Sequence, residues 1–407
     1  MNYKTLEVKL KARVVQWLEC FLAKEKVAGS NPVSRSEKKR TNISSFDLAI
    51  KHASTSLRAC YTDQGIVAGP HHFTDYWARD SFFASLGALE LGDQEVVAKM
   101  VQLFFTYQRD DGMLPYRIMR GPVTLGKYLG KPKFYKQPKA TFRLRDLGQE
   151  ILDGTTLALL FAAKTQQKNL LPQIKKALNY LSKKEKHGLL WDGPMAEWND
   201  AVWKFGNLLY SNVIYWKMYQ ELSVFVAEID LPWSKQLSEK ARAIAQGMRR
   251  RLWNGQYFAD WHDWKRRDHF YPFGNCLAVI WGLTSKAETD SILTACDQIY
   301  SGPFLPTNSP RYPWYRIDFL QRLAGMADYQ NNGIVWWQPI TAYIKALRLT
   351  GQVQRAEQLF IPLAEKITDD EVIHECYEST LKPVRRKLYT AEHPFAWASG
   401  MIIWAMS

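Results

Sequence analysis

Cysteine is scarce in this sequence, and the cysteines that are present follow no recognisable spacing. There are five in 407 residues, an odd number, and no two of them form a C-x-x-C motif. This usage argues against a disulfide framework and favours buried free thiols in a reducing compartment. We therefore expect a cytoplasmic protein.

Long hydrophobic runs and the common nucleotide and protease motifs are also missing. The longest apolar stretches are too short to span a bilayer, and Gln16 and Glu19 interrupt the only run that resembles a signal peptide. We expect no membrane partner. Neither phosphate-binding glycine loop occurs, nor does G-x-S-x-G. His71 and His72 lack the H-E-x-x-H pattern, so we expect no metal and no cofactor.

The sequence carries a net charge of +14, without a nucleic-acid-binding motif. No helix-turn-helix pattern or zinc spacing accompanies the basic residues, so no nucleic-acid partner is expected. Part of the excess lies in residues 1–42, where the run Val27–Arg35 resembles conceptual translation through a tRNA gene. We expect the true start near Asn42, with residues 1–42 a disordered or non-native extension and residues 43–407 a single functional domain.

Aromatic residues are abundant, with 16 Trp, 20 Tyr and 19 Phe. Trp and Tyr combine a flat apolar face with a polar edge. A sugar ring has the same two-sided character, so this composition suits carbohydrate binding. A bulky hydrophobic core is the alternative explanation for any one of them.

From Ser44 onward, apolar residues recur at the helical spacing, and convincing strand alternation is scarce. The connections alternate between tight turns and long loops rich in Trp, Gly, Pro and Asp. Helical hairpins of this kind stack into a ring whose long loops gather on one face. The predicted helices are 45–60, 80–91, 94–108, 149–165, 170–184, 207–223, 233–252, 274–283, 287–299, 315–328, 338–350, 353–366 and 393–405.

Three acid-bearing segments lie in these loops or at helix starts. In the first, Arg79 and Asp80 could hydrogen-bond sugar hydroxyls, or Asp80 could merely cap a helix. In the second, Asp200 lies close to Trp198, and an acid against an indole is poorly solvated and stays protonated. A capping cluster is the alternative. In the third, Glu375 could activate water, or it could belong to a solvated helix end.

These segments, in this order, resemble the six-hairpin glycosidases over roughly Phe73 to Trp404. Trp77-Ala78-Arg79-Asp80 resembles the family's W-x-R-D element, Trp198-Asn199-Asp200-Ala201 its W-M-D-A, and Glu375-Cys376-Tyr377-Glu378 its E-x-Y-[ND]. Residues 329–337 resemble Y-H-N-G-G-x-W-P more loosely, and residues 394–400 resemble F-x-W-[ST]-x-[AG]. The nearest members are the amylo-alpha-1,6-glucosidases of glycogen debranching, the neutral invertases and the processing alpha-glucosidases.

The resemblance implies an all-α fold, an (α/α)6 toroid with its active-site cleft among the long loops. It also implies a glycoside hydrolase that acts on an alpha-glucosidic or related linkage of an oligosaccharide or polysaccharide by inversion. Asp200 would be the catalytic acid and Glu375 the catalytic base, with Glu197 and Glu378 as substitutes. The substrate-binding residues would be Trp77, Arg79, Asp80, Trp198, Trp336 and Trp397.

Two other functions stay open. A sugar isomerase or epimerase on a similar barrel would rely on histidine bases, which no motif here places at the cleft. A non-catalytic carbohydrate-binding toroid would need neither acid, whereas both are present.

Overall fold

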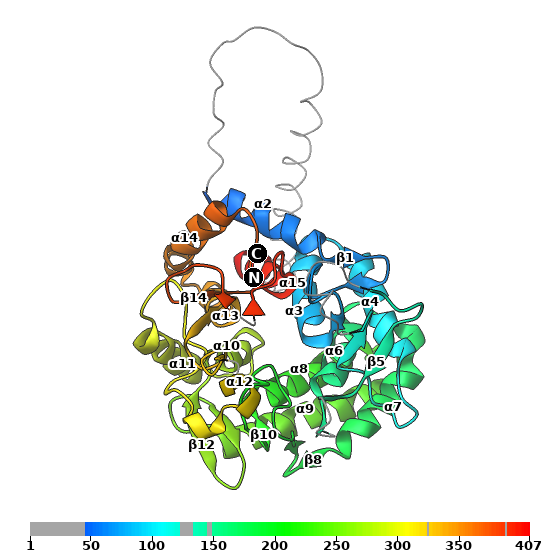
Figure 1. The fold of residues 1–407 in the computed structure, drawn as a ribbon. Helices are drawn as coiled ribbons and strands as arrows, with labels where there is room; N and C mark the ends of the chain where they lie inside the picture. Colours follow the sequence, from blue (N-terminus) through cyan, green and yellow to red (C-terminus); the bar gives the residue numbers. More distant parts are fainter. Residues whose placement is uncertain (1–44, 123–132, 145–148, 324, 387–388) are drawn as a thin grey trace. The chain divides into compact units, whose positions relative to one another are not determined.

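The computed structural model describes residues 45–122, 133–144, 149–323, 325–386 and 389–407. The predicted extension, residues 1–42, lies outside this part of the chain and stays a prediction. Residues Ser45–Met406 form one compact unit. Its helices follow one another around a ring (Figure 1).

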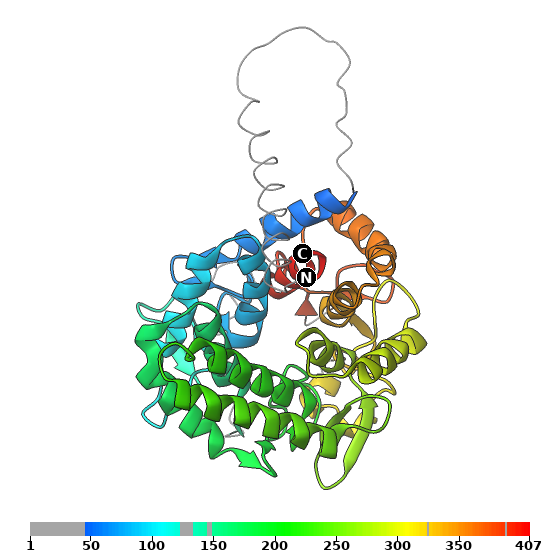
Figure 2. The same cartoon turned by 180° about the vertical axis from the view of Figure 1, so that it is seen from behind.

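Six helices form the inner wall of the ring. In the described chain each packs against the next, and the last packs against the first, which closes the circle (Figures 1 and 2). Their side chains are buried on nearly every face; in α6, for example, every residue from Asp153 to Ala163 is buried. A helix that is hydrophobic all round belongs in a core. The inner helices are α3 (Ala78–Glu90), α6 (Asp153–Lys164), α8 (Leu209–Phe225), α10 (Pro272–Ile280), α13 (Trp337–Leu349) and α15 (Ala396–Met406).

Six further helices pack outside this wall, each against an inner partner. They are amphipathic: α9 buries Leu237, Ala241, Ile244 and Met248, which recur along one stripe, and turns its charged residues to solvent. The double ring confirms the predicted all-α (α/α)6 toroid. The outer helices are α2 (Ser45–Arg58), α4 (Gln94–Thr106), α7 (Leu171–Ser182), α9 (Leu231–Leu252), α11 (Lys286–Ile299) and α14 (Val353–Asp370).

The ring closes where α3 and α15 approach each other through two glycines. A Cβ atom on Gly400 would lie 2.4 Å from the carbonyl oxygen of Ala84, and one on Gly87 would lie 2.4 Å from that of Gly400. A side chain at either position would separate the first and last inner helices. Glycine is therefore required for this contact.

Connections differ in length between the two ends of the ring. Inner helices pass to outer ones through short turns, such as residues 91–93 and 350–352. Long loops lead back and enter the inner helices at their N-termini, so these loops share one face, as predicted. Strands β3 (Tyr76–Trp77), β10 (Asn207–Leu208) and β13 (Ile334–Trp336) run directly into α3, α8 and α13.

The strands form small antiparallel sheets within the loops. Three-stranded sheets have the orders β3-β4-β5 and β10-β11-β12, and the others are two-stranded pairs. The remaining strands are β1 (Tyr61–Thr62), β2 (Gly65–Ile66), β4 (Arg117–Met119), β5 (Lys139–Thr141), β6 (Arg143–Leu144), β7 (Gln149–Glu150), β8 (Glu185–Lys186), β9 (Leu189–Leu190), β11 (Ala259–His262), β12 (Arg266–Phe270), β14 (Cys376–Glu378), β15 (Arg385–Arg386) and β16 (Tyr389–Thr390).

Two details of the predicted helices are wrong. The segment 315–328 holds only a 3-10 turn at Trp314–Arg316 and the five-residue α12 (Phe319–Leu323). Helix α3 begins at Ala78, so Asp80 lies inside its first turn and does not cap it. A second 3-10 turn, Lys168–Leu170, precedes α7.

The cysteines of the described chain are free and buried: Cys60, Cys276, Cys296 and Cys376. The sulfur atoms of Cys276 and Cys296 are 3.7 Å apart, well beyond a disulfide bond. Within the same part of the chain, no helix combines the length and apolar character needed to cross a bilayer.

Candidate active site

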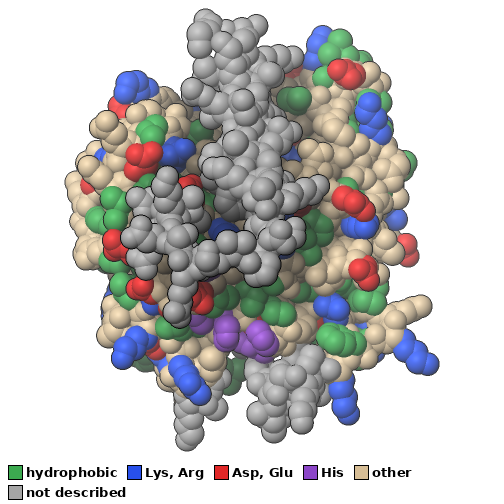
Figure 3. All heavy atoms as spheres, turned by 90° about the horizontal axis from the view of Figure 1, so that it is seen from above, with side chains coloured by type: hydrophobic (Ala, Val, Ile, Leu, Met, Phe, Trp, Pro, Cys, Tyr) green, Lys and Arg blue, Asp and Glu red, His purple; other side chains and the backbone are tan. Residues whose placement is uncertain are grey.

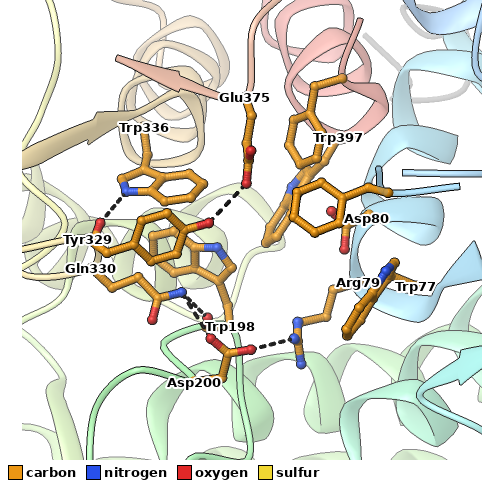
Figure 4. Close-up of a pocket in the computed structure, with 12 residues that line it drawn as sticks. Trp77, Arg79, Asp80, Trp198, Asp200, Tyr329, Gln330, Trp336, Glu375 and Trp397 are labelled. Atoms are coloured by element: carbon orange, nitrogen blue, oxygen red, sulfur yellow. Dashed lines mark hydrogen bonds and ion pairs between the residues drawn. The ribbon is translucent and has the colours of Figure 1, made fainter. Parts of the chain in front are cut away.

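A pocket lies at the N-terminal ends of the inner helices, with about 480 Å³ of empty space that includes its opening to solvent (Figure 4). All eight residues proposed from the sequence line it, although they come from segments scattered between residues 77 and 397. These are Trp77, Arg79, Asp80, Trp198, Asp200, Trp336, Glu375 and Trp397. Phe73, Tyr329, Gln330 and Phe395 complete the lining.

Asp200 lies on the loop between β9 and β10. Its carboxylate is 3.5 Å from Nη2 of Arg79 and 3.4 Å from Nε2 of Gln330. The Gln330 amide also holds the loop itself, because it donates to the carbonyl of Trp198 at 2.6 Å and accepts from the backbone N–H of Ala201 at 2.9 Å. The Asp200 side chain remains 31% exposed.

Glu375 immediately precedes β14, which pairs with β13 and brings it beside Trp336. Three donors reach its carboxylate: the Tyr329 hydroxyl at 3.0 Å, the Glu392 backbone N–H at 3.1 Å and the Tyr389 hydroxyl. Burial raises the pKa of Glu375 to about 8, while the hydrogen bonds from Tyr389, Glu392 and Tyr329 act in the opposite direction.

Tyr329 and Gln330 are neighbours in the chain, yet they contact different acids. Tyr329 donates to Glu375, and Gln330 donates to Asp200. Figure 4 shows the two carboxyl groups approaching the pocket from different sides, with this dipeptide between them. One short segment therefore holds both acids in place.

Arg79 and Asp80 lie in the first turn of α3. The Arg79 guanidinium donates to buried Asp153 at 3.1 Å through Nη1 and faces Asp200 through Nη2. Burial raises the pKa of Asp80 to about 7, although the positive charge of Arg79 opposes this shift. The pair gives the pocket a fixed cation and a carboxyl group whose protonation state can change near neutral pH.

Indole rings form much of the pocket wall. Trp198 meets Trp336 edge-to-face with ring centroids 5.6 Å apart, and it meets Trp397 in the same way at 6.0 Å. The indole nitrogen of Trp336 donates to the carbonyl of Tyr329 at 2.8 Å. No described residue accepts a hydrogen bond from the indole nitrogens of Trp77 and Trp397. The wall thus offers apolar faces, and these two indole nitrogens are buried.

The substitute acids named from the sequence do not line the pocket. Glu197 is fully buried in a cluster with Lys204 and Asp260. Glu378 forms an ion pair with Arg386, with N–O contacts as short as 2.7 Å. Only Asp200 and Glu375 of the four proposed catalytic acids face the cavity.

The sequence did not indicate that Glu392, which hydrogen-bonds Glu375, is itself held by a buried network. Glu392 is 1% exposed and accepts from the backbone N–H groups of His72 at 2.8 Å and Phe73 at 2.9 Å. The ring of His71 lies 2.9 Å from its carboxylate and 5.4 Å from the ring of His393. Figure 3 shows histidines gathered on one face beside hydrophobic side chains. No local motif marks this cluster, because its members come from residues 71–73 and 392–393, which are far apart in the sequence.

The fold of this chain is similar to those of several solved structures, although its sequence matches no known family. Neither a protein-family model nor a curated protein sequence matches the chain. Among solved structures, a GH63 mannosylglycerate hydrolase from Thermus thermophilus in complex with Tris is similar, with a TM-score of 0.61 and 15% identity, over 88% of this chain and 99% of that one.

Two other solved structures are similar to the same extent. A rhamnosidase from Klebsiella oxytoca with rhamnose bound has a TM-score of 0.62 and 12% identity, over 92% of this chain and 65% of that one. A glycosidase in complex with glucose has a TM-score of 0.61 and 14% identity, over 89% of this chain and 95% of that one. At such low identity the likeness establishes architecture: this chain shares the helical toroid of these glycosidases.

Proposed function

We propose that the protein is a glycoside hydrolase that cleaves an alpha-glucosidic or related linkage by an inverting mechanism. The observation that carries this proposal is the meeting of Asp200 and Glu375 at one pocket, together with Arg79, Asp80 and the indole wall. Two carboxyl groups flanking a sugar-sized cavity are the machinery that glycoside hydrolysis requires.

Asp200 is assigned the role of general acid because of where it lies. Asp200 is partly exposed, whereas Glu375 is buried. The leaving group of a glycoside must extend toward solvent, so its oxygen belongs on the open side, next to Asp200. The acid donates its proton to that oxygen as the bond from the anomeric carbon to the oxygen breaks.

Glu375 is assigned the role of general base. Its three hydrogen-bond partners are all donors, which favour the ionised form against the effect of burial. Once the proton is lost near pH 8, the raised pKa makes the carboxylate a stronger base. A water molecule between Glu375 and the sugar would give its proton to the carboxylate while its oxygen attacks the anomeric carbon. Inversion requires the two carboxyl groups to be roughly 6.5–9.5 Å apart.

The remaining pocket residues would hold the sugar. Arg79 supplies donors and Asp80 supplies acceptors for neighbouring hydroxyls. Trp198, Trp336 and Trp397 would cover the apolar faces of the ring. A sugar isomerase is disfavoured, because no histidine is among the described residues that line the pocket.

A panel of glycosides would identify the substrate. The similar structures include a mannosylglycerate hydrolase and complexes with rhamnose and with glucose. We would test these classes beside maltose, isomaltose, panose, trehalose, sucrose and kojibiose. A debranching-like or glucosidase-like enzyme, acting in the cytoplasm, is expected to release glucose from isomaltose, panose or maltose.

Glycosyl fluorides separate the two roles, because fluoride departs without a proton. Asp200→Asn is expected to lose roughly 10²–10⁴-fold on the natural linkage and to keep most activity on the corresponding fluoride. Glu375→Gln is expected to lose activity on both, and NMR of the first product formed should show the inverted anomer. Wild-type turnover of the natural linkage by Asp200→Asn would refute the assignment.

A further inference from the structure

The exposed tryptophans of the described chain gather in one region, close to Asp200. Exposure is 39% for Trp203, 80% for Trp264 and 71% for Trp314, and Tyr315 beside the last is 63% exposed. All other described tryptophans and tyrosines are buried or less exposed than these. We call these four side chains the aromatic ledge. Large apolar rings left in water in one place usually mark a binding surface.

Part of the ledge is fixed to the loop that carries the proposed acid. The backbone N–H of Trp203 donates to the carbonyl of Arg316 at 2.6 Å, and that of Asp318 donates to the carbonyl of Ala201 at 2.8 Å. The Arg316 guanidinium also donates to the carbonyl of Trp203 at 2.9 Å. Residues 316–318 thus pair with the chain that directly follows Asp200.

Trp264 joins the ledge from the hairpin between β11 and β12. Its ring meets Phe205 edge-to-face at 5.1 Å. Asp263, in the same turn, lies 3.8 Å from the Arg316 guanidinium. The hairpin is therefore tied to both segments that carry the other ledge residues.

The ledge lies on the face where the pocket lies. Its residues belong to the loops that enter α8, α10 and α13, and these helices begin at the pocket end of the ring. Figure 1 places β10, β12 and α12 close together on one side of the ring. Asp200, the more exposed of the two acids, lies on the same loop as Trp203.

We propose that the ledge binds the leaving-group side of an oligosaccharide, so that the enzyme acts on chains longer than a disaccharide. This inference rests on the proposed hydrolase. Aromatic faces stack against the C–H faces of sugar rings. The Arg322 guanidinium lies 5.0 Å from the ring centre of Trp314 and adds hydrogen-bond donors for hydroxyl groups.

A protein surface is the competing occupant, because Leu320 and Leu323 on α12 are also exposed. Trp203, the first exposed side chain after Asp200 along the chain, is aromatic and not aliphatic, which favours the glycan. A glycan site also accounts for the backbone bonds that tie the ledge to the loop of the acid. Self-association through this surface is therefore one outcome of the test below.

The test compares wild-type protein with the Trp314→Ala/Tyr315→Ala variant. Substrates are malto-, isomalto- and manno-oligosaccharides from disaccharide to heptasaccharide. For the linkage that is cleaved, kcat/KM of the wild type is expected to rise at least about tenfold with length. The variant is expected to lose that gain and keep its disaccharide rate. Val224→Ala, an exposed change at the opposite end of α8, is the control.

Several results would overturn the inference. One is a kcat/KM independent of chain length in the wild type, which leaves the hydrolase proposal intact. Another is a wild-type oligomer that the ledge variant converts to a monomer without any effect on chain-length preference. If no substrate is cleaved, the hydrolase proposal fails. Native gels containing maltoheptaose or mannoheptaose then decide on binding: wild-type migration unchanged by both sugars overturns the ledge as well.

Discussion

Replacing Lys204 by methionine tests the buried ion cluster formed by residues on either side of the proposed acid in the chain. The Lys204 ammonium lies 2.9 Å from Asp260 and also contacts Glu197, and all three side chains are fully buried. Burial alone would lower the pKa of Lys204, but Asp260 and Glu197 outweigh it and the pKa is raised. The substitution fills similar space and leaves two buried carboxyl groups without their cation.

The expected cost follows from that burial. Removing one partner of a buried ion pair costs about 3–5 kcal/mol, because the remaining charge is uncompensated. For a domain of this size, that corresponds to a fall in Tm of about 4–7 °C. The contact between Lys204 and Glu197 also joins the two sides of the loop that carries Asp200. Turnover is therefore expected to fall under conditions in which the variant is still folded.

The pH dependence provides a second readout. Burial already raises the pKa of Glu197, and loss of the cation raises it further above the unfolded value. A carboxyl group with a raised pKa contributes stability below its unfolded pKa and loses it as pH rises through the folded pKa. Calorimetry should therefore show a larger loss in Tm at about pH 8 than at about pH 5.

Lys99→Met is the matched control. Lys99 pairs with Glu95 on the surface of α4, where water screens both charges. We expect no measurable change in Tm for this variant. An equal effect of the two substitutions, or a larger loss for Lys204→Met at the lower pH, would refute the reasoning.

Other predictions concern the base and the ring closure. Activity of the wild type should rise as Glu375 loses its proton, near pH 8 in the empty enzyme, and a flat kcat/KM profile from about pH 6 to 9 would contradict this. Tyr389→Phe removes a donor that lowers the pKa of Glu375, so the rising limb should move to higher pH and kcat should fall about tenfold. Gly400→Ala should destabilise the fold by about 1–3 kcal/mol in urea unfolding, because the new methyl group meets the backbone of α3. Gly302→Ala, where a Cβ atom meets no neighbour, is its control and should be neutral.

Helical periodicity predicted most of the fold. Twelve of the thirteen predicted segments correspond to helices of the described chain, with ends that differ by at most four residues. The exception, 315–328, is instructive. Tyr315, Phe319, Leu320 and Leu323 repeat at helical spacing but remain exposed. Their spacing predicts the buried face of a helix, whereas these side chains lie on the surface.

Local motifs located the lining of the pocket but not its supports. Asp200 and Glu375 lie beside other distinctive residues in the chain, so a short pattern can mark each of them. Tyr389 and Glu392 have no such neighbours, and they matter only because the ring brings residue 392 to His72 and Phe73. A contact of that kind depends on the folded ring, which one sequence does not reveal. The catalytic and binding roles themselves stay predictions.

The position of Tyr329-Gln330 has a consequence for stereochemistry. Hydrolases that retain configuration need their carboxyl groups about 5–5.5 Å apart, and inverting ones need room for a water. Because adjacent residues of one segment contact one acid each, the gap between the two acids depends in part on the local path of that segment. Lengthening or shortening that stretch by one residue is the smallest edit that would move one acid relative to the other, and the anomer of the released sugar would report it.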